Sequence, residues 1–134
     1  MTERLQPSGA PERAPPRILI VENDDALRGL QKRILERLDA VVIAASSIDE
    51  AQLIIHGQEL DLVISDVKAV RPNGLDLFAW AVRERAELAD RFLFVAADET
   101  NTMIAQLAAH HPDRVVRKPF GVQDYLARVT RLLP

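Results

Sequence analysis

The sequence contains no cysteine, no excess of basic residues and no long apolar stretch. Without cysteine the chain can form no disulfide and perform no thiolate chemistry. Its 17 basic and 20 acidic side chains leave a formal net charge of -3, which provides no general attraction for nucleic acid or anionic lipid. Nothing near the start resembles a signal peptide or a membrane span. We therefore expect a cytoplasmic protein with no nucleic-acid or membrane partner, which recognises its protein partners locally.

The apolar content of the chain is sufficient for one hydrophobic core. Hydrophobic residues make up 48% of the 134 residues, a size and composition that favour a single domain. Residues 1–16 include prolines at positions 7, 11, 15 and 16 and have no apolar periodicity that could offset the entropy lost on ordering. We therefore predict a disordered, proline-rich tail over residues 1–16 and one domain over residues 17–134.

Five short apolar runs follow the predicted tail. They cover residues 18–21, 41–44, 62–64, 92–95 and 115–116. The runs are continuously apolar rather than alternating, which indicates strands that are buried on both faces, as in a parallel sheet covered by helices.

Amphipathic stretches of helical length separate these runs. In each stretch apolar residues recur at three- and four-residue steps, which places them along one stripe of a helix. The stripes consist of Leu27, Leu30, Ile34 and Leu38; Ile48, Ala51 and Ile55; Leu75, Phe78 and Val82; Ile104, Leu107 and Ala108; and Val122, Tyr125 or Leu126, Val129 and Leu133. Five successive βα units with right-handed crossovers predict an α/β fold, a three-layer doubly wound (βα)5 parallel sheet.

Charged and polar side chains follow the first, third and fifth runs. Glu22 and Asn23 end the first, Asp66 ends the third and Lys118 follows the fifth. Ligands of such sheets bind outside the carboxyl ends of the strands, so we expect these side chains to share one crevice. Mg²⁺ is held by one or two carboxylates and a carbonyl, and a carboxylate can attack a phosphoryl group when cations offset its charge. We assign the nucleophile role to Asp66 and phosphoryl-oxygen binding to Lys118.

Three separated motifs make the chain similar to the receiver domain of bacterial two-component response regulators. The motifs are residues 18–28 (ILIVENDDALR), residues 61–66 (DLVISD) followed by Asn73-Gly74-Leu75, and Lys118-Pro119-Phe120. The resemblance extends over residues 17 to 133. It implies a flavodoxin-like fold with strand order 2-1-3-4-5 and a phosphorelay role. Asp66 would accept a phosphoryl group from a histidine kinase or phosphotransfer protein in the presence of Mg²⁺.

The resemblance also implies roles for individual residues and partners. Glu22 and Asn23 match the acidic pair of the family, and Lys68 matches the residue whose backbone carbonyl ligates the metal beside Asp66. Lys118 matches the family lysine, whose bond to the following proline is often cis. Such a domain is a signalling module and not an enzyme. A downstream effector protein is expected as a second partner, and the resemblance allows a homodimer.

Several positions depart from the family pattern. The second acidic residue is Asn23 rather than aspartate, so we expect weak Mg²⁺ binding. The hydroxyl residue after the fourth strand is replaced by Ala96, the aromatic residue of the fifth strand by Val115, and the usual Met-Pro by Ala69-Val70. An alternative function is therefore a degenerate receiver that acts as a phosphorylation-independent protein-interaction module.

Structural interpretations also exist for some of these residues. One of Asp24 and Asp25 is expected to cap the first helix. Residues 71–74 (RPNG) are interpreted as a turn in which Pro72 presets φ and Asn73 or Gly74 tolerates positive φ. Trp80 lies off its helix stripe, either at the edge of the core or at a partner surface.

Other functions fit the residues less well. A nucleotide or flavin binder needs a Gly- or Ser/Thr-rich turn after its first strand, whereas the turn at residues 22–25 is acidic and repels phosphate. An aspartyl phosphatase places a second carboxylate two residues after its nucleophile, where this chain has Lys68. The chain ends at Pro134, directly after the last predicted helix, and we expect no appended DNA-reading domain.

Overall fold

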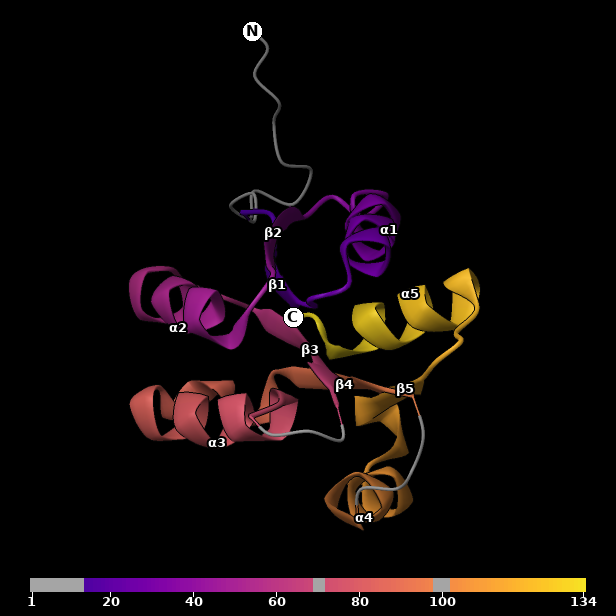
Figure 1. The fold of residues 1–134 in the computed structure, drawn as a ribbon. Coiled ribbons are helices and arrows are strands. Elements are labelled where there is room, and N and C mark those ends of the chain that lie inside the picture. Colours follow the sequence, from indigo (N-terminus) through magenta and orange to yellow (C-terminus); the bar gives the residue numbers. More distant parts are fainter. Residues whose placement is uncertain (1–13, 69–71, 98–101) are drawn as a thin grey trace, which may run out of the picture.

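Figure 1 shows a five-stranded sheet between two layers of helices. The computed structural model describes residues 14–68, 72–97 and 102–134. The strands are β1 (Arg17–Val21), β2 (Val41–Ala45), β3 (Leu62–Val67), β4 (Phe92–Ala96) and β5 (Val115–Arg117). All neighbouring strands pair in parallel, in the order β2-β1-β3-β4-β5. The predicted fold class and strand order are therefore confirmed.

Five helices and two short 3-10 turns connect the strands. They are α1 (Asp25–Leu35), α2 (Ile48–Gly57), α3 (Gly74–Glu84), α4 (Thr102–His110) and α5 (Val122–Leu132), with η1 (Ala86–Asp90) and η2 (Pro112–Arg114). Helices α1 and α5 lie on one side of the sheet, and α2 and α3 lie on the other (Figure 1). None of these helices, within the described part of the chain, has the length and apolar character needed to cross a bilayer.

Two apolar clusters fill the space between the sheet and its two helical layers. Along β1, Ile18 and Ile20 pack in the cluster with α1 and α5, while Leu19 and Val21 pack in the cluster with α2, α3 and α4. Strand β1 is therefore buried on both faces, which explains its continuous apolar run. The edge strand β2 differs, because Val41 is 36% exposed. The prediction that the strands are buried on both faces is therefore confirmed for β1, but it was wrong for the edge strand β2.

The buried face of α1 differs from the predicted stripe. Leu30 is 39% exposed, and Leu38 lies beyond the end of the helix. The residues of α1 that are buried are Gln31, Ile34 and Leu35. Ile34 is buried and Leu38 packs against the core as predicted, but the prediction was wrong for Leu30, because the polar residue Gln31 occupies the core-facing position beside it.

The remaining helices follow their predicted stripes more closely. On α5 the buried residues are Tyr125 and Val129. Of the two alternatives for the second stripe position, Tyr125 and Leu126, the structure therefore buries the tyrosine. On α3 the buried centre is Leu77 and Ala81, and the predicted stripe residues flank it with partial burial. Trp80 packs partly buried against the core, with its ring edge-on to His56 at a centroid distance of 5.2 Å.

Local sequence signals set the starts of α1 and α3. The Asp24 carboxylate accepts a hydrogen bond from the Leu27 N–H at 2.8 Å and so caps α1. Asn73 caps α3 in a reciprocal capping box with Asp76, and no non-glycine residue of the described chain has positive φ. Gly74 also lacks positive φ and begins α3, so the tolerance of positive φ predicted for Asn73 or Gly74 is not used, and Arg71 lies outside the described residues.

Gly74 has a different role from the one that was predicted. A Cβ atom at this position would lie 2.5 Å from both the backbone oxygen of Asp66 and the Oγ of Ser65. The absence of a side chain therefore lets the start of α3 approach the end of β3 closely. This contact fixes α3 directly beside the predicted nucleophile.

Candidate functional site

Three of the predicted side chains meet at the carboxyl edge of the sheet. Lys118 Nζ lies 2.7 Å from Asp66 Oδ1 and 3.3 Å from Glu22 Oε1. Glu22 directly follows β1, Asp66 is the last residue but one of β3, and Lys118 directly follows β5. Because the strands are parallel, their carboxyl ends bring residues far apart in the sequence to one place. One ammonium group therefore joins two carboxylates.

Asp66 is buried, and a second lysine lies beside it. The side chain of Asp66 is 6% exposed, and Lys68 Nζ lies 3.1 Å from its Oδ2. Apart from this ion pair, Asp66 Oδ2 has no hydrogen-bond partner among the described residues, and neither has the buried Oγ of the neighbouring Ser65. Such orphaned atoms are rare in folded proteins and often mark a site that receives a ligand. Ser65 was not predicted as a site residue, because a small polar residue within an apolar run is indistinguishable by pattern from the buried strand around it.

Glu22 is 1% exposed and is bound from several directions. Its Oε2 accepts the Asp24 N–H at 3.2 Å, and its Oε1 is shared by Lys118 and by Gln31 Nε2 at 3.5 Å. A buried carboxylate without such partners would be strongly destabilising. The charge of Glu22 is therefore compatible with burial because it lies within a network of donors.

Gln31 and Tyr125 extend this network and were not among the predicted site residues. The Tyr125 hydroxyl donates to Gln31 Oε1 at 2.7 Å, and both residues are at most 1% exposed. Phe120 stacks on the Tyr125 ring at a centroid distance of 4.6 Å. A signal for Gln31 existed in the sequence, since it lies four residues after Leu27 and three before Ile34, within an apolar stripe.

The electrostatics of the site keep Lys118 charged and Tyr125 neutral. Burial acts to lower the pKa of Lys118, but the hydrogen bond to Asp66 and the charges of Asp66 and Glu22 outweigh it, and the pKa is raised above 10.5. Burial, followed by the charge of Glu22, raises the pKa of Tyr125 well above its usual range. Lys118 is therefore an ammonium group and Tyr125 a hydroxyl donor at neutral pH.

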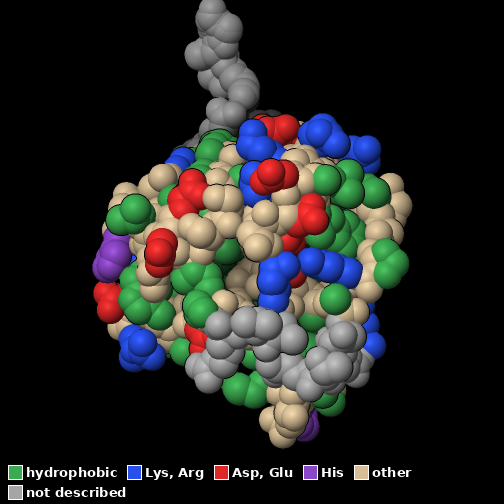
Figure 2. Space-filling model, viewed as in Figure 1, with side chains coloured by type: hydrophobic (Ala, Val, Ile, Leu, Met, Phe, Trp, Pro, Cys, Tyr) green, Lys and Arg blue, Asp and Glu red, His purple; other side chains and the backbone are tan. Residues whose placement is uncertain are grey.

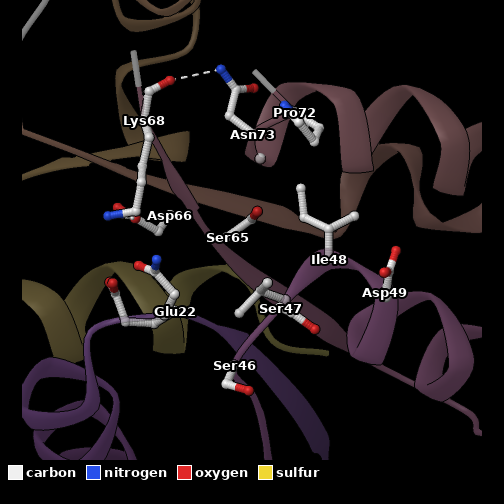
Figure 3. Close-up of a pocket in the computed structure, with 13 residues that line it drawn as sticks. Glu22, Ser46, Ser47, Ile48, Asp49, Ser65, Asp66, Lys68, Pro72 and Asn73 are labelled. Carbon is white, nitrogen blue, oxygen red and sulfur yellow. Dashed lines mark hydrogen bonds and ion pairs between the residues drawn. The ribbon is translucent and has the colours of Figure 1, made fainter. Parts of the chain in front are cut away.

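An open pocket of about 300 Å³ lies beside these groups. Its lining includes Glu22, Asp66 and Lys68, with the chain before α2 and the start of α3 on its other sides. Figure 2 shows acidic and basic side chains next to one another around the hollow on this face. In Figure 3 the Lys68 side chain extends toward Asp66, whereas its carbonyl is directed toward Asn73, whose Nδ2 donates to it at 2.7 Å. Asn23 is exposed and lines the pocket.

The donor atoms around the pocket suit a hard divalent cation. Carboxylate, amide and carbonyl oxygens are the ligands that Mg²⁺ takes, and Glu22, Asp66 and Asn23 line the pocket with oxygens of the first two kinds, whereas the Lys68 carbonyl is bound to Asn73 Nδ2. Asp66 Oδ2 accepts no hydrogen bond among the described residues, and its contact there is the ion pair with Lys68, so a cation could take the place of that ammonium group. The described residues contain no group of three or more His, Cys, Asp or Glu side chains arranged for a metal. The residues therefore fit Mg²⁺ with few charged ligands, and the Lys68 ammonium offsets part of their charge.

Comparison with known proteins shows the family of this chain. The sequence pattern of the response regulator receiver domain matches residues 18–130. The chain belongs to the response regulator receiver domain family. Receiver domains of this family are signalling modules of two-component systems, so the predicted family is confirmed.

Curated relatives of this receiver domain are longer proteins. PetR of Rhodobacter capsulatus is 32% identical over 122 residues, which cover 90% of this chain and 49% of PetR. The aerobic respiration control protein ArcA of Escherichia coli K12 is 32% identical over 119 residues, which cover 88% of this chain and 48% of ArcA. The receiver chain thus spans about half the length of the curated relatives it matches.

Solved structures show the same fold. The non-phosphorylated HemR receiver domain from Leptospira biflexa has a TM-score of 0.73 at 30% identity and covers 87% of this chain and 93% of its own. A CheY-like receiver domain from Methanospirillum hungatei has a TM-score of 0.74 at 23% identity, with coverage of 88% and 93%. At that lower identity the likeness shows the fold alone.

Two of the departures from the family pattern lie in the core of the receiver. Ala96, at the end of β4, and Val115, at the start of β5, are buried with 3% and 5% exposure, and they provide neither a hydroxyl nor a ring. The Lys118–Pro119 peptide bond is cis, as the resemblance implied. Ala69 and Val70 lie outside the described residues.

Proposed function

We propose that this receiver domain accepts a phosphoryl group on Asp66 from the phosphohistidine of a histidine kinase or phosphotransfer protein. The observation that carries the proposal is the position of Asp66, whose buried carboxylate lies 2.7 Å from the Lys118 ammonium at the open edge of the sheet. A carboxylate becomes an effective nucleophile toward phosphorus when nearby cations offset the charge of the incoming group. Lys118 and Lys68 both supply such charge.

The transfer is a substitution at phosphorus. A carboxylate oxygen of Asp66 forms the new O–P bond, the P–N bond of the donor phosphohistidine breaks, and the imidazole leaves with the electron pair of that bond. Lys118 lies at Asp66 Oδ1, where its ammonium can bind a phosphoryl oxygen without a large movement. Mg²⁺ held by Glu22, Asn23, Asp66 and the Lys68 carbonyl would add positive charge to the phosphoryl oxygens.

The proposed partners follow from the family. A kinase or phosphotransfer protein supplies the phosphoryl group, and an effector protein or effector domain receives the signal. Two relatives have names that describe a regulatory function. They are the aerobic respiration control protein ArcA and the transcriptional regulatory protein MalR of Bacillus subtilis. For this chain the expected absence of a nucleic-acid partner and the formation of a homodimer both remain predictions.

Intact mass spectrometry tests the proposal directly. The protein is incubated with phosphoramidate and Mg²⁺, and we expect a species heavier by about 80 Da, the mass of one phosphoryl group. Asp66→Ala should remove this species, whereas the same change at Asp49, a carboxylate elsewhere on the pocket lining, should leave it. No adduct on the wild-type protein, or an adduct that persists in Asp66→Ala, would contradict the assignment.

A second candidate function is protein binding without phosphorylation. It is favoured by Asn23, which removes one negative charge from the metal site, and by the apolar residues Ala96 and Val115. This candidate predicts no adduct in the mass experiment and a partner affinity that is unchanged in Asp66→Ala. Both outcomes differ from those expected for a phosphoacceptor.

A further inference from the structure

A chain of polar contacts leads from the acidic site through α1 to α5. Lys118 contacts Glu22 Oε1 at 3.3 Å, Gln31 Nε2 donates to the same oxygen at 3.5 Å, and Tyr125 donates to Gln31 Oε1 at 2.7 Å. Glu22, Gln31 and Tyr125 are each at most 1% exposed. This polar chain crosses a layer that otherwise consists of apolar residues.

We propose that Gln31 and Tyr125 are positioning residues that hold the Glu22 carboxylate and transmit the occupancy of the acidic site to α5. The inference rests on the proposed phosphorylation of Asp66, and it assigns the transmission to a pair that connects the first helix with the last. In this role neither residue touches the phosphoryl group. Each acts through Glu22.

The shared oxygen of Glu22 provides the physical link. Lys118 divides its donors between Asp66 and Glu22. A phosphoryl group on Asp66 offers Lys118 more strongly charged acceptors, so the contact to Glu22 Oε1 weakens. Gln31 Nε2 is the remaining side-chain donor at that oxygen, and its distance of 3.5 Å leaves room to shorten. We therefore expect the Gln31 amide to move toward Glu22 when Asp66 is occupied.

Tyr125 must respond to such a movement. The two ends of the Gln31 amide are rigidly joined, so a shift of Nε2 changes the position of Oε1 relative to the Tyr125 hydroxyl. This hydroxyl is fully buried, and a buried donor that loses its acceptor costs free energy. The Tyr125 ring also stacks on Phe120, which follows the Lys118–Pro119 bond. The Lys118 end of the polar chain, through Phe120, and its Tyr125 end therefore lie close together at the start of α5.

The apolar residues Ala96 and Val115 cannot transmit the phosphorylated state through a hydroxyl or a ring, so a different path is needed. Ala96 has no hydroxyl that could follow a phosphoryl group, and Val115 has no ring that could change its orientation. A polar route exists instead on the other face of the sheet, between α1 and α5. The surface expected to report the phosphorylated state is therefore formed by these two helices.

Tyr125 provides a specific readout because it is the single tyrosine of the chain. The protein is labelled with tyrosine carrying ¹³C at Cζ, whose chemical shift depends on the hydrogen bond of the hydroxyl. We expect phosphoramidate and Mg²⁺ to shift this resonance in the wild-type protein. Gln31→Leu should abolish the shift, although the same mass adduct forms. Gln123→Leu, the same substitution at an exposed position of α5, should retain it.

A second measurement separates this inference from the proposed function. Lys118→Met and Glu22→Gln each alter the Glu22 contacts without any phosphodonor, and both should move the Tyr125 resonance in a Gln31-dependent manner. If no adduct forms, the phosphoacceptor role fails while these variants still test the polar chain. Either of them suffices should the other fail to fold. An unchanged resonance in the fully phosphorylated wild type, or an equal shift in Gln31→Leu, would overturn the inference.

Discussion

Removal of Gln31 and Tyr125 one at a time and together should reveal their coupling as a difference in stability. Gln31→Leu leaves the Tyr125 hydroxyl without its acceptor, and Tyr125→Phe leaves Gln31 Oε1 without its donor. Because both groups are at most 1% exposed, water cannot replace the lost partner without opening the core. Each single change should therefore lower the free energy of unfolding by about 1–3 kcal/mol.

The double variant should be less destabilised than the sum of the single variants. Replacing both polar partners by apolar groups of similar shape is nearly neutral, so we expect a coupling of about 1–2 kcal/mol between the two positions. The remaining loss in the double variant comes from Glu22, which keeps Lys118 and the Asp24 N–H as donors but loses Gln31.

Urea unfolding followed by tryptophan fluorescence measures these free energies. Trp80 is the single tryptophan, packs against the core on the opposite side of the sheet, and is left unchanged by all three variants. Gln123→Leu serves as the control for the substitution itself and should change stability by less than about 0.5 kcal/mol. Additive effects of the two changes, within about 0.5 kcal/mol, would refute the reasoning that the hydroxyl and the amide depend on each other.

Three further predictions concern the site and its surroundings. Gly74→Ala should destabilise the fold by about 1–3 kcal/mol in thermal melts, because its Cβ would meet Asp66 and Ser65 at 2.5 Å; Gly57→Ala, with no atom within 4 Å, should not. The raised pKa of Lys118 means that its contribution to stability is fully present below pH 10.5 and is lost as pH rises through the folded-state pKa. Urea titrations should thus show the wild type and Lys118→Met converging in stability above that pH, and a constant difference would contradict this. Asn23→Asp should enlarge the rise in melting temperature caused by millimolar Mg²⁺, relative to the wild type and to Asn23→Ala, because a third carboxylate binds the ion more tightly. An equal rise in all three proteins would exclude position 23 from the metal site.

The fold could be predicted because its determinants are local and repeated. The run at residues 18–21 is apolar at every position since β1 is covered on both faces, and the same holds for β4. The convergence of Glu22, Asp66 and Lys118 followed from topology alone, because residues at the carboxyl ends of parallel strands share one edge. No knowledge of side-chain packing was needed for either step.

The missed features depend on contacts between distant residues. Gln31 is polar, and its burial depends on Tyr125 on α5, so the apolar pattern of α1 assigned the neighbouring Leu30 to the core instead. Lys68 was assigned a role through its carbonyl, but its ammonium group also approaches Asp66. Gly74 was interpreted through its backbone freedom, whereas the close approach of α3 to β3 explains it. In each case a neighbour remote in sequence determines the role.

The contact between Gln31 and Tyr125 joins positions 94 residues apart. During synthesis the segment that contains Glu22 and Gln31 leaves the ribosome long before α5, so the phenol that completes their buried network is added last. A nascent chain halted before residue 125 would hold a glutamine amide and a glutamate facing an unfilled apolar surface. The buried network around Glu22 is therefore completed only when α5 packs against α1.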